Sequence, residues 1–359
     1  AVRAINNLAE GDANKAALVQ IGILKDLQNI FLNHDTPKSL RVEATDVLTS
    51  LFEKNPVALQ QIIEDREVDR LLDIGLQSGN EGDGTTVDTY AFDLLVLYVG
   101  SEDKLRALFD VSKVESLLRR LDGPNRALAS QVIRLLGHLA LNDAIMPRIG
   151  LGHQHYVNAL KSENGIDQLY GAMAIGNSAR TEDICKQYMQ DGAVPLLIGV
   201  CYDKDTEERA RHLSASALRN IGITVEHRPL ITQHEHCFDA LIQILETNNA
   251  VVLFASVLAI KVLVTANPQG ADAFFATPEA VEKLVQMFER YMDEGQRRVQ
   301  FETARIFPVL ASYKNEYRTL LAQKGGAAAL QSLVTSTFAV LQVEGLKELL
   351  IWAEDNDLQ

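Results

Sequence analysis

Few residues of this sequence stand at spacings that could support covalent or metal chemistry. Residues 233–237 gather His234, His236 and Cys237, side chains that bind zinc or copper, within one turn. No fourth ligand follows at a usual spacing, so we expect a polar turn there. The Gly-rich acidic segment 78–86 has no Gly-Lys-Ser/Thr after it, which argues against a phosphate loop. We therefore expect no metal and no other cofactor.

The motifs of catalysis are also missing. The sequence has no nucleophile elbow, no zinc-protease motif, no dinucleotide-binding glycine motif and no kinase or hydrolase signature. Scattered Asp, Glu and His on amphipathic helices are more often solvated than paired for acid–base work. We expect a protein that acts by binding and carries out no covalent chemistry, so it is not an enzyme.

The sequence supports recognition of another protein better than catalysis or metal binding, because Asn residues recur in similar apolar surroundings. Ala-Ile-Gly-Asn177-Ser-Ala aligns with Ala-Ile-Asn-Asn7-Leu-Ala and with Ala-Leu-Arg-Asn220-Ile-Gly. Weaker copies place their register positions at residues 50, 97, 138, 262 and 309. Successive register positions lie 39 to 47 residues apart, the period of armadillo and HEAT repeats.

The elements that must position these residues are helices. Gly192 ends one helix and Pro195 opens the next, as expected from their backbone preferences. In the first full repeat we expect helices over 14–22, 23–32 and 39–53. Extra residues in two longer repeats are placed in segments 78–86 and 291–298.

We predict an all-α armadillo-repeat protein, a right-handed superhelical solenoid with about eight repeats plus partial ends. It forms a single domain over 1–359. The expected repeats are 1–10 (partial), 11–55, 56–100, 101–143, 144–183, 184–225, 226–267, 268–314 and 315–359 (partial). Because residues 1–10 already read as an inner helix, we expect the natural protein to continue upstream.

Composition narrows the class of partner. The chain has 359 residues, 47% hydrophobic and 23% charged, with a net charge of −14. This charge disfavours nucleic acid and favours basic proteins or tails. No apolar run is long enough to span a bilayer, so direct membrane insertion is not expected. Three widely spaced cysteines, Cys185, Cys201 and Cys237, indicate buried free thiols in a reducing compartment. We expect a cytoplasmic protein, with the nucleus as an open alternative.

The groove of the predicted solenoid is lined by the register positions and by the residues four positions earlier, one helical turn away. Its early part is acidic at Glu43, Asp46 and Asp93, and its end turns apolar at Leu258 and Val262. The polar middle consists of Arg134, His138, Asn177 and Asn220. Nuclear-import adaptors place Trp one turn before Asn, whereas the one tryptophan here is Trp352. Cadherin-adhesion armadillo proteins use a basic groove, which this sequence does not have.

Segments 93–109, 171–180 and 213–223, with 252–254 and 324–327 in their places, resemble one family. This family comprises the armadillo-type dissociation stimulators and chaperones of small GTPases (the SmgGDS family). The resemblance implies a non-enzymatic exchange factor or chaperone for Ras- or Rho-type GTPases with basic, prenylated C-terminal tails. It also implies that the lipid pocket lies mostly in N-terminal repeats absent here.

The resemblance assigns roles to particular residues. Glu43 and Asp46 match the family's acidic patch, and Asn177 matches its Asn-based patch. Thr181, expected one turn after Asn177, stands where the family commonly has Asn. The full expected partner-binding set is Glu43, Asp46, Asp93, Arg134, His138, Asn177, Arg180, Thr181 and Asn220. A scaffold that binds an extended basic peptide, without acting on a nucleotide, is the alternative left open by the sequence.

Overall fold

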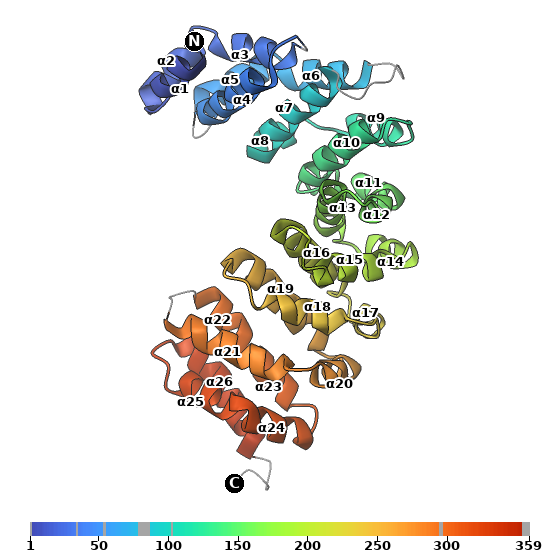
Figure 1. Ribbon diagram of the computed structural model, residues 1–359, viewed down its shortest axis with the longest axis vertical. Coiled ribbons are helices and arrows are strands. Elements are labelled where there is room, and N and C mark those ends of the chain that lie inside the picture. The colour runs from blue at the N-terminus through green and yellow to red at the C-terminus, as the bar shows by residue number, and fades with distance from the viewer. Residues whose placement is uncertain are drawn as a thin grey trace. The chain divides into compact units, whose positions relative to one another are not determined.

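The computed structural model describes residues 2–33, 35–52, 55–77, 87–101, 103–293 and 297–353. Within these ranges the side chains at 77, 87–89, 101, 291–293 and 297 are not described. The chain forms two compact units, residues 1–155 and 156–359, with the boundary inside α12 (Figure 1). The described residues form helices and turns and no strand. That the units make one continuous solenoid stays a prediction.

In the first unit the helices follow one another in groups of three. A single helix, α1 (Val2–Leu8), comes first. The groups are α2 (Asp12–Gln20), α3 (Ile23–Leu32) and α4 (Lys38–Phe52); α5 (Pro56–Glu64), α6 (Glu67–Gln77) and α7 (Val87–Ser101); and α8 (Asp103–Arg106), α9 (Val111–Leu121) and α10 (Arg126–Leu139). Then come α11 (Met146–Gly150) and α12 (His153–Leu160). The helices expected over 14–22, 23–32 and 39–53 correspond to α2, α3 and α4.

The second unit continues the same order after α13 (Gly165–Ser178). Its groups are α14 (Glu182–Gln190), α15 (Ala193–Tyr202) and α16 (Glu208–Ile221); α17 (His227–Thr232), α18 (Cys237–Ile244) and α19 (Ala250–Val264); α20 (Pro268–Ala276), α21 (Ala280–Asp293), α22 (Arg297–Ala304) and α23 (Ile306–Ala311); and α24 (Asn315–Leu321), a kinked turn η1 (Ala322–Gly326), α25 (Ala327–Val334) and α26 (Ala339–Ala353).

The third helix of each group, which we call the inner helix, carries the expected register position. Asn7, Ser50, Leu97 and His138 lie in α1, α4, α7 and α10; Asn177, Asn220, Val262 and Val309 lie in α13, α16, α19 and α23. All are half-buried except Asn7, which is exposed. Inner helices of successive groups pack on one another, as α13 does on α16 and α16 on α19. The register positions therefore mark an equivalent surface position in each group.

The turn between the first two helices of a group has a recurring backbone feature. A residue with left-handed φ stands there in six groups: Gly22, Arg66, Gly192, His236, Glu279 and Gly325. This conformation costs about 1–2 kcal/mol for a residue with a Cβ atom and almost nothing for glycine. Glycine at Gly192 is thus explained by the turn itself, as the sequence suggested. His236, one of the possible metal ligands considered in the sequence, occupies this turn. Its ring stacks on that of Tyr202, with 4.5 Å between the ring centroids.

Inner helices begin at side-chain caps. The Oδ1 atoms of Asn125, Asn164 and Asn249 each accept a hydrogen bond from a backbone N–H in the first turn of α10, α13 and α19. Such a cap satisfies a donor that the helix leaves unpaired. Among the four successive inner helices α10, α13, α16 and α19, an asparagine cap thereby fixes the start of all but α16.

The group over residues 268–311 differs from the expectation at two points. The extra residues expected as an insertion at 291–298 instead lengthen α21, which runs to Asp293, and open α22 at Arg297; residues 294–296 lie outside the described residues. The inner helix is interrupted at Arg305 between α22 and α23. Pro308 explains this break, since it has no N–H to donate to the carbonyl of Ala304. The acidic segment expected as a loop at 78–86 also lies outside the described residues.

The three cysteines are free and buried, as expected. Burial raises the pKa of Cys185 to about 11 and that of Cys237 to about 12. The pKa of Cys201 is raised as well, for the same reason. At neutral pH the thiols are therefore protonated and weakly nucleophilic.

Candidate partner-binding surface

The inner helices hold most of the expected partner-binding residues. In the first unit Glu43 and Asp46 lie on α4, Asp93 on α7, and Arg134 and His138 on α10. Asn177 and Asn220 lie on α13 and α16 of the second unit. Arg180 and Thr181 are both exposed and follow α13.

The acidic end of this surface is smaller than the sequence indicated. Glu43 forms an ion pair with Arg3 of the preceding inner helix, with 2.7 Å between Arg3 Nη2 and Glu43 Oε1. Asp93 pairs with Arg134 of the following inner helix at 3.0 Å. Burial raises the pKa of Asp93, and the guanidinium of Arg134 partly opposes that shift. Asp46 is exposed and has no ion-pair partner among the described residues.

Asn220 ties two inner helices together. Its Nδ2 donates to the carbonyl oxygen of Gly176 on α13 at 2.7 Å. Its Oδ1 accepts from Nε and Nη2 of the neighbouring Arg219 at 3.0 and 2.6 Å. Both ends of the amide are thus used inside the protein, so a role in binding would require breaking these bonds.

His138 and Asn177 are half-buried, each at the register position of its inner helix. The ring of His138 lies beside Gly100 of α7: a Cβ atom at that glycine would be 3.6 Å from the ring. The imidazole therefore packs against α7 at Gly100, at a distance that would be an ordinary van der Waals contact for a Cβ atom.

Thr181 was placed wrongly on α13 by the sequence. The helix ends at Ser178, and Ala179 has ψ 68°, which leaves the helical region. Thr181 has extended backbone angles and is the N-cap of α14, where its Oγ1 accepts from the N–H of Ile184 at 3.4 Å. It is not one turn beyond Asn177, and its hydroxyl serves the next helix.

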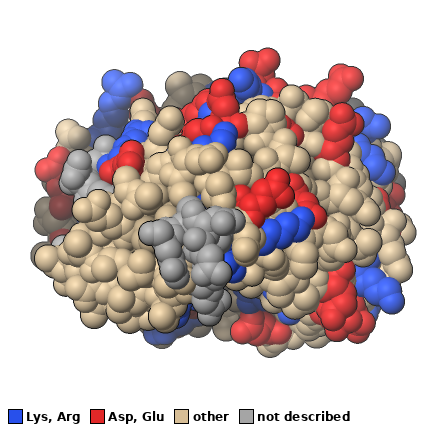
Figure 2. Space-filling model, turned by 90° about the horizontal axis from the view of Figure 1, so that it is seen from below, with Lys and Arg blue, Asp and Glu red and all other residues tan. Residues whose placement is uncertain are grey.

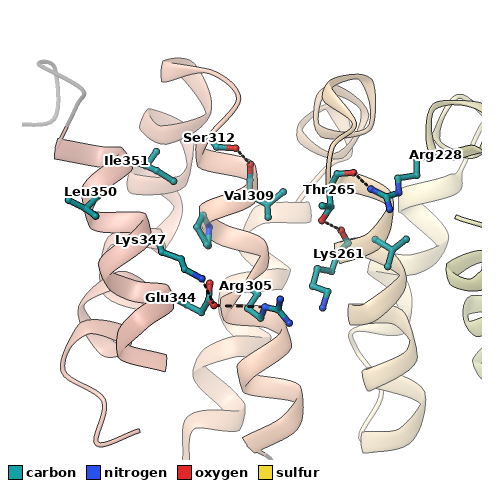
Figure 3. Close-up of a pocket in the computed structure, with 12 residues that line it drawn as sticks. Arg228, Lys261, Thr265, Arg305, Val309, Ser312, Glu344, Lys347, Leu350 and Ile351 are labelled. Carbon is teal, nitrogen blue, oxygen red and sulfur yellow. Dashed lines mark hydrogen bonds and ion pairs between the residues drawn. The ribbon is translucent and has the colours of Figure 1, made fainter. Parts of the chain in front are cut away.

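The second unit contains a pocket that was not predicted from the sequence, although two register positions, Val262 and Val309, line it. Figure 3 shows this pocket, a cavity of about 680 Å³ between α19, α23 and α26. Its apolar lining is Val262, Pro308, Val309, Leu350 and Ile351, and its polar lining is Arg228, Lys261, Thr265, Arg305, Ser312, Glu344 and Lys347. Two register positions of neighbouring inner helices thus form part of one cavity.

The charges around this pocket are joined into a chain across three inner helices. Lys347 pairs with Glu344 at 2.9 Å, and Arg305 reaches the same Glu344 at 3.9 Å (Figure 3). Arg305 also reaches Glu302 at 3.5 Å. Lys261 of α19 pairs with the same Glu302. The cationic groups of this chain are therefore already engaged in the unbound protein.

The side chain of Arg228 is held in place by backbone carbonyl groups. Its guanidinium donates to the carbonyl oxygens of Gly222, Thr265 and Ile223 at 2.8, 2.6 and 3.0 Å. Burial lowers its pKa from the usual arginine value. It braces the turns after α16 and α19 rather than presenting a mobile charge.

The last helix leaves an apolar row exposed. Val340, Val343, Leu346, Leu349 and Leu350 of α26 are each more than two-fifths accessible to solvent. Figure 2, which views the structure from below, shows a broad area without Lys, Arg, Asp or Glu. Exposed apolar surface of this extent is the kind that other protein surfaces cover.

Neither a metal site nor a membrane span is found in the part of the chain that the structure describes. No cluster of three or more His, Cys, Asp or Glu side chains there could hold a metal ion. Cys237 points into the core and is 2% exposed. None of the described helices combines the length and apolarity needed to cross a bilayer.

Groups of three helices, stacked through their inner helices at a period near 40 residues, define an armadillo-repeat protein. Solved structures agree. An engineered protein superposes with a TM-score of 0.73 at 23% identity, over 98% of this chain and 83% of its own. A designed armadillo repeat protein superposes with a TM-score of 0.59 at 18% identity, over 66% of this chain and 99% of its own. The predicted all-α armadillo fold is confirmed.

Two curated relatives narrow the class further. The chain is 24% identical over 353 residues to the Rap1 GTPase-GDP dissociation stimulators 1-A and 1-B of Xenopus laevis. The match covers 96% of this chain and 51% of each relative, so the chain spans about half the length of the curated relatives it matches. No family model matches the chain. The resemblance to the armadillo-type dissociation stimulators is confirmed.

Proposed function

We propose that this protein binds a small GTPase of the Ras or Rho type through its inner-helix surface and stimulates release of GDP. The observation that carries the proposal is the similarity, over nearly the whole chain, to two proteins named as GDP dissociation stimulators of Rap1. The armadillo fold and the lack of any catalytic motif in the sequence support a mechanism by binding alone.

Linkage explains how binding alone releases a nucleotide. If the protein binds the nucleotide-free GTPase more tightly than the GDP-bound form, GDP binds the complex more weakly by the same factor. A hundredfold preference corresponds to about 2.7 kcal/mol of coupling free energy. Contacts made only by the opened GTPase supply this difference, and no covalent step is needed.

The partner-binding residues remain a proposal. Asp46 is the carboxylate of the acidic end that lies open to a basic tail, and the net charge of −14 favours approach of such a tail. We propose that the tail is basic and prenylated, and that binding takes place in the cytoplasm. Affinities for prenylated and unmodified GTPase are expected to lie within about tenfold of each other, or roughly 1.4 kcal/mol.

A nucleotide-release assay tests the function. Small GTPases of the Ras and Rho types are loaded with fluorescent GDP, and release is followed after addition of the protein and excess unlabelled GDP. At least one GTPase is expected to release GDP faster in proportion to the added protein. Binding of the basic tail without faster release would favour the alternative, a scaffold for an extended basic peptide. Neither release nor binding across the panel would refute both.

A charge reversal tests the acidic end. Asp46→Lys is expected to weaken GTPase association about tenfold at low ionic strength, because an attraction between exposed charges becomes a repulsion. Asp73→Lys is the matched control, since Asp73 is an exposed aspartate on α6, which is not an inner helix. Equal effects of both reversals would show that only the overall charge matters.

Asn177 is tested separately. Asn177→Ala is expected to reduce GTPase binding while the free energy of unfolding changes little. A large fall in stability with binding per folded molecule intact would give Asn177 the interhelical role that Asn220 has.

A further inference from the structure

The inner helix α16 carries a row of basic side chains in the middle of the second unit. Arg209, His212 and Arg219 follow one another at intervals of three and seven residues, so they lie on one side of the helix. The register position Asn220 lies on the same side, which places the row on the inner-helix surface. α16 packs between α13 and α19 (Figure 1). We call these three basic residues the Arg209 row.

All three side chains of the row reach solvent. Arg209 is exposed, and His212 and Arg219 are half-buried. Arg219 donates from Nε and Nη2 to Oδ1 of Asn220, at 3.0 and 2.6 Å, which leaves its Nη1 atom without a partner among the described residues. Neither this Nη1 atom nor the ring nitrogens of His212 are buried. A ligand on the inner-helix surface can therefore contact each of the three groups.

No carboxylate from the surrounding helices neutralises the row. The helices that pack most extensively on α16 are α13, α15 and α19, and all of their residues are described. Together with α16 they contain two carboxylates, Asp167 and Glu208. Asp167 accepts a hydrogen bond from the hydroxyl of Ser162 at 2.9 Å, and Glu208 accepts one from the hydroxyl of Thr247 at 2.6 Å. Neither carboxylate is bonded to a member of the row.

Nearby basic side chains differ from the row because they have partners inside the protein. Arg211 donates to the carbonyl oxygen of Cys201 at 3.0 Å, and Lys261 of α19 pairs with Glu302. The Arg209 row instead keeps like charges together, within a chain whose net charge is −14.

The electrostatics of the row agree with this absence of a counter-charge. Burial lowers the pKa of Arg219 from the usual arginine value, with no opposite charge to offset it. Burial, together with the charges of Arg209 and Arg219, lowers the pKa of His212. At pH 7 the imidazole is therefore neutral, and the two arginines carry the positive charge of the row.

We propose that the Arg209 row binds an acidic segment of a partner protein, in which two carboxylates stand about four or five residues apart. Arg209 and Arg219 are ten residues apart on α16, or about 15 Å along the helix axis. An extended chain advances about 3.3 Å per residue, so four or five residues cover this distance. The neutral imidazole of His212, between the two arginines, adds one hydrogen-bond donor.

The spacing of the charges favours a protein segment over a nucleic acid. Two arginines over about 15 Å match two separated carboxylates, whereas a nucleic-acid strand carries a phosphate about every 3.4 Å. The net charge of −14 also repels a ligand with so dense a negative charge. The polarity of the row is the opposite of that at Asp46, where a basic tail is expected, so the two sites recognise different segments.

The test uses peptides and the full chain at pH 7 and low salt. Two degenerate libraries of labelled ten-residue peptides with blocked ends are compared: one has Glu at its third and seventh positions and uncharged residues elsewhere, and the other has Gln in place of both Glu. Binding is followed by fluorescence anisotropy and through the ring ¹H–¹³C signal of His212, which His212→Asn assigns. The Glu library is expected to bind about tenfold more tightly and to move this signal.

Four variants assign the effect to the row. Arg209→Gln is expected to weaken binding of the Glu library about threefold, and Arg209→Lys to keep it, because the ammonium retains the charge. The double variant Arg209→Gln/Arg219→Gln is expected to bind both libraries equally. Lys186→Gln makes the same change of net charge at an exposed site on α14, which is not an inner helix, and is expected to change nothing. Circular dichroism verifies that each variant is folded.

Three results would overturn the proposal. The first is equal binding of the two libraries to the wild-type chain with the His212 signal unmoved, a result that does not depend on the folding of a variant. The second is equal weakening by Lys186→Gln and Arg209→Gln, since only the overall charge would then matter. The third is tighter binding of a ten-nucleotide DNA strand than of the Glu library, with a shift of the same signal. Because no GTPase is present, failure here leaves the proposed function standing, and failure of nucleotide release leaves this test unaffected.

Discussion

Glu348 on α26 makes the stability of the last repeat depend on pH. Its side chain is fully buried, and neither carboxylate oxygen has a hydrogen-bond partner among the described residues. Burial raises its pKa from 4.5 to about 8. The folded protein thus keeps the proton at neutral pH, whereas the unfolded chain releases it.

The sign and size of the effect follow from proton linkage. Between about pH 4.5 and pH 8 the folded state binds more protons than the unfolded state, so the free energy of unfolding falls as the pH rises. The slope approaches about 1.4 kcal/mol per pH unit in the middle of this window. From pH 5 to pH 8 the contribution of Glu348 amounts to a loss of about 3 kcal/mol. At pH values below the unfolded-state pKa or above the folded-state pKa, the contribution of Glu348 to the free energy of unfolding does not change with pH.

Glu348→Gln removes the titrating group and keeps its shape. The stability of this variant relative to the parent is expected to rise by about 3 kcal/mol between pH 5 and pH 8. Trp352, the single tryptophan, lies one turn further along α26, so its fluorescence in a urea titration reports on this repeat directly. Glu316→Gln, at an exposed site on α24, is the control and should follow the parent at every pH. A constant difference between Glu348→Gln and the parent across this range would refute the reasoning.

Three further outcomes are expected. Asn220→Ala should lower the free energy of unfolding by about 1–3 kcal/mol in urea, because the carbonyl of Gly176 loses its partner; no change would mean that water replaces the amide. Gly192→Ala should cost about 1–2 kcal/mol through its φ of 79° alone, since the added Cβ would touch nothing, whereas Gly199→Ala inside α15 should stabilise by about 0.5–1 kcal/mol; equal effects would contradict the strain argument. The three thiols should react slowly with Ellman's reagent at pH 8 in the native protein and rapidly in urea; fast native reaction would show that the burial is wrong.

The helices and register positions were predictable because they depend on local patterns. The inner helix of a repeat must present small and apolar residues to its neighbours, and this requirement recurs at a fixed period that can be counted along the sequence. The turn at Gly192 was predictable for a similar reason, since glycine tolerates its left-handed backbone. The same turn at His236 has no glycine to mark it. The sequence around it could therefore also be interpreted as a possible metal site.

The ion pairs could not be predicted from sequence alone. Asp93 and Arg134 lie 41 residues apart, and only the packing of α7 on α10 brings them together. Because Arg134 neutralises Asp93, the acidic end of the surface carries less negative charge than the carboxylates in the sequence indicated. Thr181 was misplaced because the resemblance to the family's Asn-based patch was carried one turn beyond Asn177, although the chain leaves the helix at Ala179. The break before α23 did have a signal in the sequence, Pro308, four residues after the last residue of α22.

The bonds between inner helices also bear on how the chain folds. Asn220 and Gly176 are 44 residues apart, and Lys261 and Glu302 are 41 apart. Each such bond closes a loop of only one repeat, so the entropy lost in closing it does not grow with the length of the chain. Folding of either unit is then able to nucleate at any adjacent pair of repeats and to spread from there, at the speed typical of helical proteins with local contacts. Amide hydrogens of α16, which is flanked by α13 and α19, should consequently exchange more slowly than those of α26, whose outer row faces solvent.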